Sequence, residues 1–459
     1  MSKPESEGQM TRGFGLVQSV ALNVANMVGV GPFITIPLLV ASMGGPQALL
    51  GWIVGAAIVI CDGQVWSELG AALPGSGGSY RFLKVTYGPE SWGRLMVFLF
   101  IWQFVFSGPL EVASGMIGFA GYASYLWPAM TPLGRKLLGA SVGVVAVLFL
   151  SRRITSLGKL TVTLTAGTFL TMVAILLSGI LHFEAARAFD VPPHAIGWNR
   201  GFFLGLGSAS LISVYDYLGY YDVCYVGDEV RDPARVIPRS IAYSIGFCAI
   251  AYIGIYLVII GVVPWKEAIQ SRFVVSDFMQ RLYGPTAAVV VTLMVLWTAF
   301  GSVFALLLGY SRVPYAAARD GYFFRPFARL HPEKGFPHIS LYVVGAISIA
   351  ASFFDLEQVV AALITTRILV QFIAQIFALP LLRRRLSASQ RPYKMPLYPL
   401  PPAVAFLGWM YVFLTSGWNY VLAGLATLAA GLVAFLIWSR VTAGWPFAGS
   451  GAAREPKAL

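Results

Sequence analysis

Charged residues are scarce in this chain. Asp, Glu, Lys and Arg make up 11% of its 459 residues, whereas hydrophobic residues make up 57%. Soluble domains carry roughly 25% charged residues, so this chain has less than half of the usual solvating charge. The mean hydropathy of +0.73 agrees with this shortage. The composition therefore excludes an ordinary soluble domain and predicts an all-α protein that crosses a membrane many times.

Residue types that build disulfide frameworks, metal sites and nucleotide sites are also few. The three cysteines, Cys61, Cys224 and Cys248, lie in apolar segments without disulfide or metal-ligand spacing, so we expect them to be packing residues. All four histidines, His182, His194, His331 and His338, fall in predicted loops. No glycine loop followed by a lysine indicates phosphate binding. We therefore expect no enzyme activity, no cofactor, no metal and no nucleotide-driven pumping.

Long apolar stretches dominate what is present. A membrane-spanning helix needs about 20 mostly apolar residues. Twelve stretches fit this requirement, although the ninth and the eleventh are short. They lie near 14–40, 45–72, 91–126, 136–151, 158–181, 201–227, 238–263, 285–318, 338–354, 357–382, 403–419 and 421–439. We expect one transporter domain over 13–441, between a tail at 1–12 and a tail at 442–459.

The basic residues predict which side each loop faces. If the N-terminus is cytoplasmic and the spans alternate, the outer loops contain only Arg135, Lys136, Arg187, Arg200, Lys266, Arg272 and Arg281. Arg367 lies within a span, and the other basic residues lie on the cytoplasmic side. This bias follows the positive-inside rule and predicts cytoplasmic termini. The net charge of +12 then indicates loops that face anionic lipid rather than a nucleic-acid partner.

The opening polar residues, MSKPESEGQMTRG, contain no signal-peptide core. We therefore expect them to be retained as the cytoplasmic N-terminal tail. The predicted location is the plasma membrane, or the inner membrane of a cell that has two.

Two of the apolar spans contain helix breakers. The first reads Asn26-Met27-Val28-Gly29-Val30-Gly31-Pro32-Phe33, and the sixth reads Tyr215-Asp216-Tyr217-Leu218-Gly219-Tyr220-Tyr221-Asp222. Backbone groups freed inside a membrane need partners, so such breaks are tolerated only within protein or beside a polar cavity. Broken helices at matching places in two halves indicate a transporter's substrate site. The spacing predicts a five-plus-five inverted repeat with peripheral eleventh and twelfth helices.

Five motifs in order give this chain a family resemblance. They are Gly29-Val30-Gly31, WSELGAALPGSGGSYRFLKVTYG at 66–88, GDEVRDPARVIPRS at 227–240, SRVPYAAARDGYFFRPFARLHP at 311–332 and LRRR…RPYKMP at 382–396. Over roughly 13–410 the chain resembles the amino acid–polyamine–organocation (APC) family of secondary transporters, with some similarity to the polyamine uptake branch. The resemblance implies that amino acids or related amines are the substrates.

The resemblance also implies roles for individual residues. It assigns substrate-carboxylate binding to the N–H groups of Gly29, Val30 and Gly31, and ammonium binding to carbonyl groups around Gly219. Asn26, Val214, Tyr215 and Leu218 are candidates to shape the pocket. The family usually has a small hydroxyl residue where Val30 stands, so only backbone donors remain at that position. The family's acid two positions after the glycine falls on Tyr221, with Asp222 one position later.

Two acids within the spans are further site candidates. Asp216 either faces a cavity or caps a helix end. Glu111, in the third span beside Pro109, is either a proton carrier, an anchor for a cationic substrate, or half of a buried ion pair with Arg367. Pairing with Arg367 would remove the argument for a cationic substrate.

Other residues are candidates for coupling and gating. Tyr220, Phe33, Trp102 and Trp297 are candidate pocket walls or gates. Glu68, Asp228, Glu229, Arg231 and Arg312 lie near cytoplasmic span ends, where they either form a gate or are solvated loop charges. The family's lysine on the fifth span falls on Thr168, which argues against a lysine-mediated mechanism. Gly301 and Ser302 could offer ligands to sodium.

The sequence thus predicts a secondary transporter of amino acids or related amines that works by alternating access. Its energy source would be a proton gradient or substrate exchange. The alternatives are a polyamine or organic-cation carrier and, in another class, a transporter-like nutrient sensor. An ion channel would need a continuous polar stripe, which the spans lack.

Overall fold

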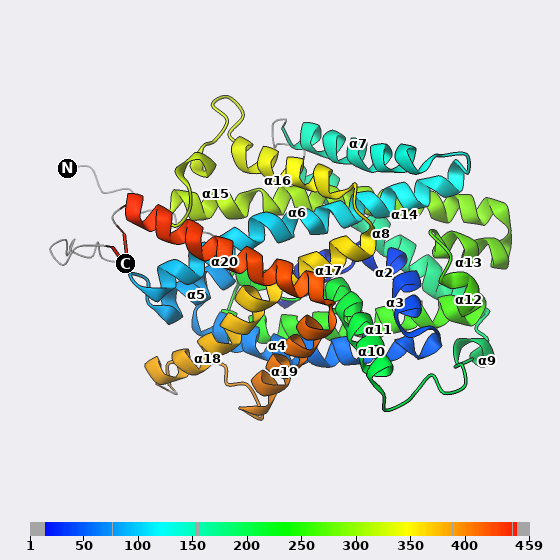
Figure 1. Ribbon diagram of the computed structural model, residues 1–459, viewed down its shortest axis with the longest axis horizontal. Coiled ribbons are helices and arrows are strands. Elements are labelled where there is room, and N and C mark those ends of the chain that lie inside the picture. Colours follow the sequence, from blue (N-terminus) through cyan, green and yellow to red (C-terminus); the bar gives the residue numbers. More distant parts are fainter. Residues whose placement is uncertain (1–13, 76, 152–156, 388, 443, 448–459) are drawn as a thin grey trace.

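The fold consists of helices that run back and forth along the long axis of the molecule (Figure 1). The computed structural model describes residues 14–75, 77–151, 157–387, 389–442 and 444–447. Within these ranges every regular element is a helix, and Phe14 and Val230 form an isolated β-bridge. This architecture agrees with the predicted all-α class.

The helices divide into two sets along the chain. The first set is α1 (Leu16–Met27), α2 (Gly31–Ile34), α3 (Ile36–Met43), η1 (Pro46–Ala48), α4 (Leu49–Ala72), α5 (Ser79–Tyr87), α6 (Trp92–Leu126), α7 (Pro132–Leu150), α8 (Leu157–Leu181) and α9 (Ala185–Ala188). The second set is α10 (Arg200–Tyr217), η3 (Asp222–Tyr225), α11 (Pro233–Val262), α12 (Trp265–Ala268), α13 (Val274–Tyr283), α14 (Pro285–Tyr310), α15 (Arg312–Arg319), η4 (Arg325–Ala328), α16 (His338–Ala351), α17 (Leu356–Arg367), the π-helix η5 (Ile368–Ile373), α18 (Ala374–Arg385), α19 (Leu400–Thr415) and α20 (Trp418–Val441).

The described residues contain 9 helical segments that are long and apolar enough to cross a membrane. Two shorter apolar helices, α16 and α19, coincide with the predicted ninth and eleventh spans. Helix α10 occupies the predicted sixth span. The protein is therefore a multi-pass membrane protein, while the count of twelve spans and the inverted repeat stay predictions. His338, expected in a loop, is instead the first residue of α16.

Local sequence explains where several helices begin and end. Helix α7 begins after Thr131, whose side chain accepts a hydrogen bond from the Gly134 N–H and satisfies one free donor of the first turn. Helix α3 ends at Gly44, which has a φ of 67° that glycine adopts without steric cost. Pro109 lies within α6 and does not interrupt it.

Connecting elements collect at two opposite ends of the molecule. Figure 1 shows α5 and the end of α18 at one end, and α9, α12 and α13 at the other. These are the groups that the charge pattern assigns to opposite sides of the membrane. The structure therefore agrees with the predicted alternation of the loops, and which end faces the cytoplasm stays a prediction.

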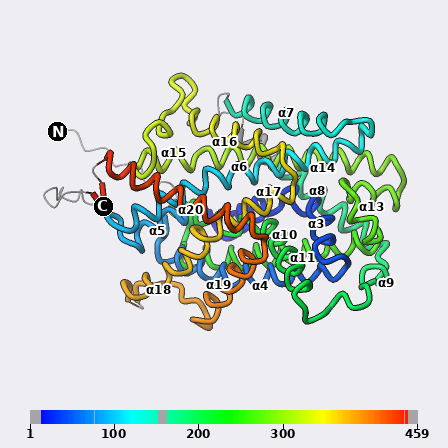
Figure 2. The backbone as a smooth tube through the Cα atoms, viewed as in Figure 1, coloured from blue at the N-terminus to red at the C-terminus, as the bar shows by residue number. Residues whose placement is uncertain are grey.

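The broken helices lie at the centre of the bundle. Helix α3 packs against α10, and α1 packs against α11. Figure 2 shows the tube of α3, in blue, beside the tube of α10, in green. Helix α6, the longest in the first set, packs against α14 and α17. Those three helices form the wall that faces the two breaks.

One of the predicted gate charges is buried and paired with two arginines. Glu68, at the end of α4, is 0% exposed. Its carboxylate lies 2.5 Å from Arg383 Nη2 and 2.9 Å from Arg391 Nη1. It also accepts a hydrogen bond from the Met395 N–H at 3.0 Å. The interpretation of Glu68 as a solvated loop charge is therefore wrong, and its contacts explain why LRRR and RPYKMP occur together.

The other predicted gate residues lie around the start of α1 and the end of α14. The Phe14 N–H donates to the Glu229 carbonyl at 3.0 Å, and the Arg231 N–H donates to the Phe14 carbonyl at 2.9 Å. These bonds join the chain before α1 to the segment after the second break, which also contains Asp228. Arg312 donates to the carbonyl of Leu308.

The predicted N-terminal tail, 1–12, lies outside the described residues, as do 443 and 448–459 of the predicted C-terminal tail. Trp445, in the described part of that tail, contacts α6. Its ring lies 5.2 Å from that of Trp92.

Candidate functional site

The first helix break frees backbone donors beside α14. Helix α1 ends at Met27 and α2 begins at Gly31, so residues 28–30 are not helical. The Gly29 N–H donates to the Met27 carbonyl at 3.0 Å, and the Val30 N–H donates to Ser302 Oγ at 3.2 Å. Within the described residues the Gly31 N–H has no acceptor. The break thus presents one free donor and a hydroxyl group.

The second break lies directly against the first. Helix α10 ends at Tyr217, and Gly219 has a φ of 107°, where only glycine is unstrained. A Cβ atom at Gly219 would lie 3.1 Å from both the Asn26 Cβ and the Met27 nitrogen. Gly219 is therefore needed for its backbone conformation and for the close approach of the two breaks.

Asn23, on α1, connects the two breaks. Its side-chain nitrogen donates to the Tyr220 carbonyl at 2.8 Å, and its side-chain oxygen accepts from the Val223 N–H at 2.8 Å. Without Asn23, the Tyr220 carbonyl and the Val223 N–H would lie unpaired inside the membrane. This one side chain therefore offsets much of the free-energy cost of unwinding the sixth span.

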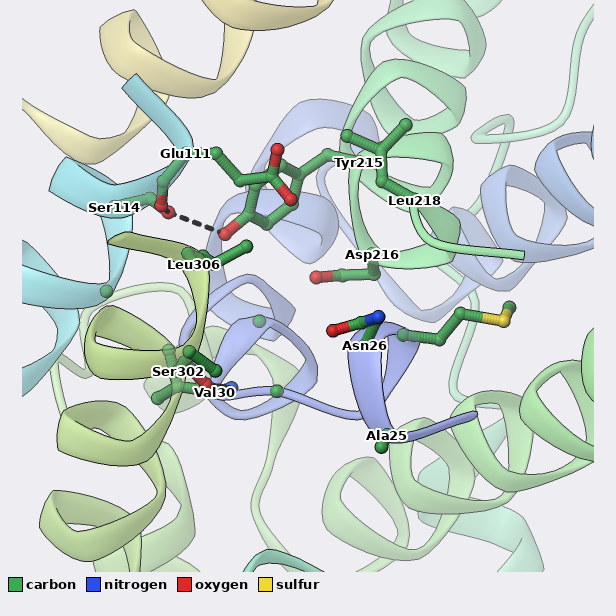
Figure 3. A pocket seen from close by; sticks show the side chains of 15 residues that line it. Ala25, Asn26, Val30, Glu111, Ser114, Tyr215, Asp216, Leu218, Ser302 and Leu306 are labelled. Carbon is green, nitrogen blue, oxygen red and sulfur yellow. Dashed lines mark hydrogen bonds between the residues drawn. The ribbon is translucent and has the colours of Figure 1, made fainter. Parts of the chain in front are cut away.

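A small cavity lies where the breaks meet α6 and α14. Its volume is about 50 Å³. Most of the predicted site residues line it, as Figure 3 shows for the labelled side chains. The lining consists of Ala25, Asn26, Met27, Gly29, Val30, Gly31, Glu111, Ser114, Gly115, Tyr215, Asp216, Leu218, Ser302, Ala305 and Leu306.

Asp216 places a carboxylate in this cavity. Its Oδ2 accepts a hydrogen bond of 2.6 Å from the Thr35 hydroxyl. Its Oδ1 has no hydrogen-bond partner among the described residues, although the residue is only 3% exposed. Figure 3 shows the carboxylate directed into the cavity beside Asn26. Of the two interpretations of Asp216, the geometry favours the one that faces a cavity.

Glu111 is paired. Its Oε2 lies 2.7 Å from Arg367 Nη2 and accepts a hydrogen bond of 2.7 Å from the Tyr310 hydroxyl. Arg367 is 1% exposed and its Nε donates to Ser107 Oγ at 3.1 Å. The predicted partner is therefore the observed one. Because Arg367 neutralises Glu111, the argument for a cationic substrate at this position no longer holds.

A second, larger cavity adjoins the small one. Its volume is about 460 Å³, and it shares Asn26, Glu111 and Leu218 with the small cavity. It extends to Arg312, Arg319 and Asp320, at the end of the molecule that carries α5 and α15. Tyr221, at the position of the family's acid, and Asp222, the acid one position later, both line this cavity.

Several residues that were predicted to form pocket walls lie away from the two cavities. Trp297 is 44% exposed and packs on Gly167, so it is not a pocket gate in this structure. The Trp102 ring nitrogen donates to the Thr427 carbonyl on α20 at 3.0 Å. Val214 is buried beside Gly55 of α4. Neither Trp102 nor Val214 lines the two cavities.

Tyr220 and Phe33 lie behind the breaks. The Tyr220 hydroxyl donates to Asp62 Oδ2 at 2.5 Å, on the side of the break that faces α4. The Phe33 carbonyl accepts a hydrogen bond of 2.7 Å from Tyr122 of α6. These contacts support the breaks and do not place either residue on the cavity wall.

The three residues considered for ion coupling share a third cavity. Thr168, Gly301 and Ser302 line a space of about 30 Å³ on the far side of the first break. Thr168 donates to the Leu164 carbonyl within α8 at 3.2 Å. The structure thus brings the predicted residues together, and sodium binding there stays untested.

Several polar residues around the site were not predicted, among them Asn23, Thr35, Ser114 and Asp62. Thr35 follows Gly31 by one helical turn and Ser114 follows Glu111 by three positions, so both spacings place them on the same helix face as their neighbours. Asp62 carried a clearer signal, because it is an acid within an apolar span. It is 1% exposed and also accepts a 2.9 Å hydrogen bond from Trp66.

Gly31→Ala is expected to disrupt the site. A Cβ atom at Gly31 would lie 2.2 Å from Asp216 Oδ1, so either α2 or the carboxylate must move. Overpacking of this kind costs about 1–3 kcal/mol, and the expected result is a lower melting temperature. Gly246→Ala on α11 is the matched control, because nothing lies within 4 Å of its added methyl group. Asp216→Ala should restore the stability of Gly31→Ala; failure to do so would show that the clash lies elsewhere.

Residues 14–442 match the amino acid permease family. The chain is 25% identical to the branched-chain amino acid permease BcaP of Bacillus subtilis, over 95% of this chain and 94% of BcaP. It is 23% identical to the serine/threonine exchanger SteT of Bacillus subtilis, over 87% and 89%. It is 26% identical to cationic amino acid transporter 4 of Mus musculus, over 78% of this chain and 58% of that protein. These are transport proteins and not enzymes. The chain therefore belongs to the amino acid permease family, within the APC superfamily that its motifs indicated.

Proposed function

We propose that this protein is a secondary active transporter that moves amino acids by alternating access. The observation that carries this proposal is the meeting of two broken helices at a small polar cavity, which opens into a larger cavity toward one end of the molecule. A site at the midpoint of the bundle with access from one end is what alternating access requires.

Hydrogen bonds join three helices on the opposite side of the site. Tyr122 of α6 donates to the Phe33 carbonyl and accepts a 3.3 Å hydrogen bond from the Val275 N–H of α13. These bonds tie α2, α6 and α13 together on the side of the site away from Arg312 and Asp320. If the positive-inside assignment holds, the larger cavity faces the cytoplasm and the structure is inward-facing. The proposed location is the plasma membrane or bacterial inner membrane, with cytoplasmic termini.

The cavity chemistry suits a molecule with both a carboxylate and an ammonium group. The free Gly31 N–H and the Ser302 hydroxyl can donate to a carboxylate. The last carbonyls of a helix lack intrahelical donors, so those at the C-terminal end of α10 can accept from an ammonium. Arg367 neutralises Glu111, so α6 contributes no unpaired acid to the cavity wall. The donors for a carboxylate favour amino acids over polyamines, which have no carboxylate.

Uptake by purified protein in liposomes would test the proposal. We expect labelled leucine, serine or lysine to accumulate above protein-free liposomes, because relatives are named for branched-chain, hydroxyl and cationic amino acids. Accumulation that needs an inward proton gradient indicates symport, and accumulation that needs internal amino acid indicates exchange. Uptake of spermidine alone would favour the polyamine alternative. Binding of amino acids without any uptake would contradict transport and favour a sensor.

A further inference from the structure

We infer that the Asp216 carboxylate is the anionic contact for the substrate's ammonium group and so decides which substrates bind. This inference rests on the proposed transport function and names one residue that performs its recognition step. The substrate's ammonium group would then contact a carboxylate and not only neutral backbone carbonyls.

The first observation is an unsatisfied oxygen. Asp216 lies on the last turn of α10, is 3% exposed, and its Oδ1 has no donor among the described residues. A buried polar oxygen without a partner is costly, so its retention at a cavity wall points to a ligand that supplies the missing donor. An ammonium group supplies such donors together with the opposite charge.

The second observation is that the carboxylate is held in position. Thr35 fixes Oδ2 at 2.6 Å while its hydroxyl also lies 3.0 Å from the Gly31 carbonyl. Figure 3 shows the carboxylate directed toward the cavity, and Oδ1 lies beside Gly31 in the cavity lining. Gly31 provides the space, because any side chain there would collide with Oδ1 at 2.2 Å. Residues from both broken helices therefore cooperate to present one oxygen.

The third observation is the absence of a competing cation. The described part of the chain contains no Lys or Arg within ion-pair distance of Asp216. Arg367, which lines the larger cavity, is instead bound to Glu111. The carboxyl group of Asp216 thus remains available to a ligand, whereas that of Glu111 is bound to Arg367.

The complementary donors lie on the same cavity wall. Among the described residues, the Gly31 N–H has no acceptor, and Ser302 Oγ accepts from Val30 but donates to no other group. An α-amino acid can therefore place its carboxylate at these donors and its ammonium at Asp216. Its side chain can extend past Leu218 and Leu306, which border both cavities.

The test compares matched molecules that differ only in charged groups. Leucine, 4-methylpentanoate and 3-methylbutylamine share one side chain, and the last two lack the ammonium and the carboxylate respectively. Lysine, 6-aminohexanoate and 1,5-diaminopentane form the corresponding cationic set. Equilibrium binding of each to purified full-length protein is measured for the unmodified chain, for Asp216→Asn and for Asp222→Asn, the last as a control acid on the larger cavity.

The unmodified protein should prefer an amino acid over its counterpart without the α-ammonium, and Asp216→Asn should remove that preference. The expected loss of amino acid affinity is about 10- to 100-fold, from the net strength of one hydrogen bond to a charged group. Binding of 4-methylpentanoate should be unchanged or stronger. Asp222→Asn should keep the preference, and Thr35→Val should reduce it.

Three outcomes would overturn the inference. If a melting curve shows folded Asp216→Asn with amino acid affinity within about threefold of the unmodified protein, Asp216 is not the anchor. If Asp222→Asn abolishes the preference instead, the anchor lies on the larger cavity. If the unmodified protein binds none of the six molecules, the proposed function itself fails, and the inference falls with it.

Discussion

Glu68→Gln is expected to lower the free energy of unfolding by about 3–5 kcal/mol, the usual cost of removing one partner from a buried ion pair. Glu68 is 0% exposed, while Arg383 and Arg391 are 17% and 12% exposed. Glutamine keeps the shape of the side chain but removes its charge. Two guanidinium groups would then face each other with nothing to neutralise them. The measurement is unfolding of purified protein in a denaturing-detergent titration.

A surface pair provides the control for this prediction. Glu267 lies 2.6 Å from Arg281, which is close to the Glu68 distances, but the two side chains are 58% and 41% exposed. Exposed pairs contribute about 0–1 kcal/mol because water screens both charges. Glu267→Gln should therefore change stability little. Equal losses in the two variants would show that burial of Glu68 does not matter.

Charge removal at Glu111 or Arg367 is expected to have the second large effect. Glu111→Gln leaves Arg367, at 1% exposure, without its counter-ion, and this should cost about 3–5 kcal/mol. Arg367→Gln should cost less. Glu111 is 12% exposed beside a cavity and keeps its hydrogen bond from Tyr310. The same detergent titration measures both variants.

The double variant distinguishes a mutual interaction from two separate ones. If the two charges stabilise each other, Glu111→Gln with Arg367→Gln should be more stable than Glu111→Gln alone, because no uncompensated charge remains buried. Additive losses would contradict the pairing. The double variant also tests substrate choice, since removing a neutral pair should leave amino acid binding largely intact. A selective loss of amine binding would instead identify Glu111 as a cation anchor.

The sequence was most informative about features that depend on a residue and its neighbours in the chain. Scarce charge and long apolar stretches identify a multi-pass membrane protein. Every segment that spans the bilayer must be mostly apolar and must pair its backbone groups within the protein. Glycine and proline within apolar spans located both helix breaks, since backbone conformation depends on the residue itself and its neighbours. The breaks, the acids within spans and the family resemblance together named most of the residues that line the small cavity, including Asn26, Gly31, Tyr215 and Asp216.

Sequence signals were weakest for aromatic residues and for Asp62. Trp297 and Trp102 lie on helices with apolar residues on all sides, so periodicity does not separate a lipid-facing or helix-packing ring from a pocket wall. Asp62 carried the same signal as Glu111, an acid within an apolar span, but its partners Tyr220 and Trp66 show that it supports the second break.

The sequence by itself determined that this protein is a transporter-family membrane protein with two helix breaks and a set of residues around them. Only the tertiary structure decided how those residues pair. Glu111 and Arg367, Val30 and Ser302, and Thr35 and Asp216 come from segments far apart in the chain. Hydrogen bonds and ion pairs depend on distances of a few ångströms between such segments, and no spacing within one helix encodes those distances. The unpartnered Asp216 oxygen is therefore a property of the fold.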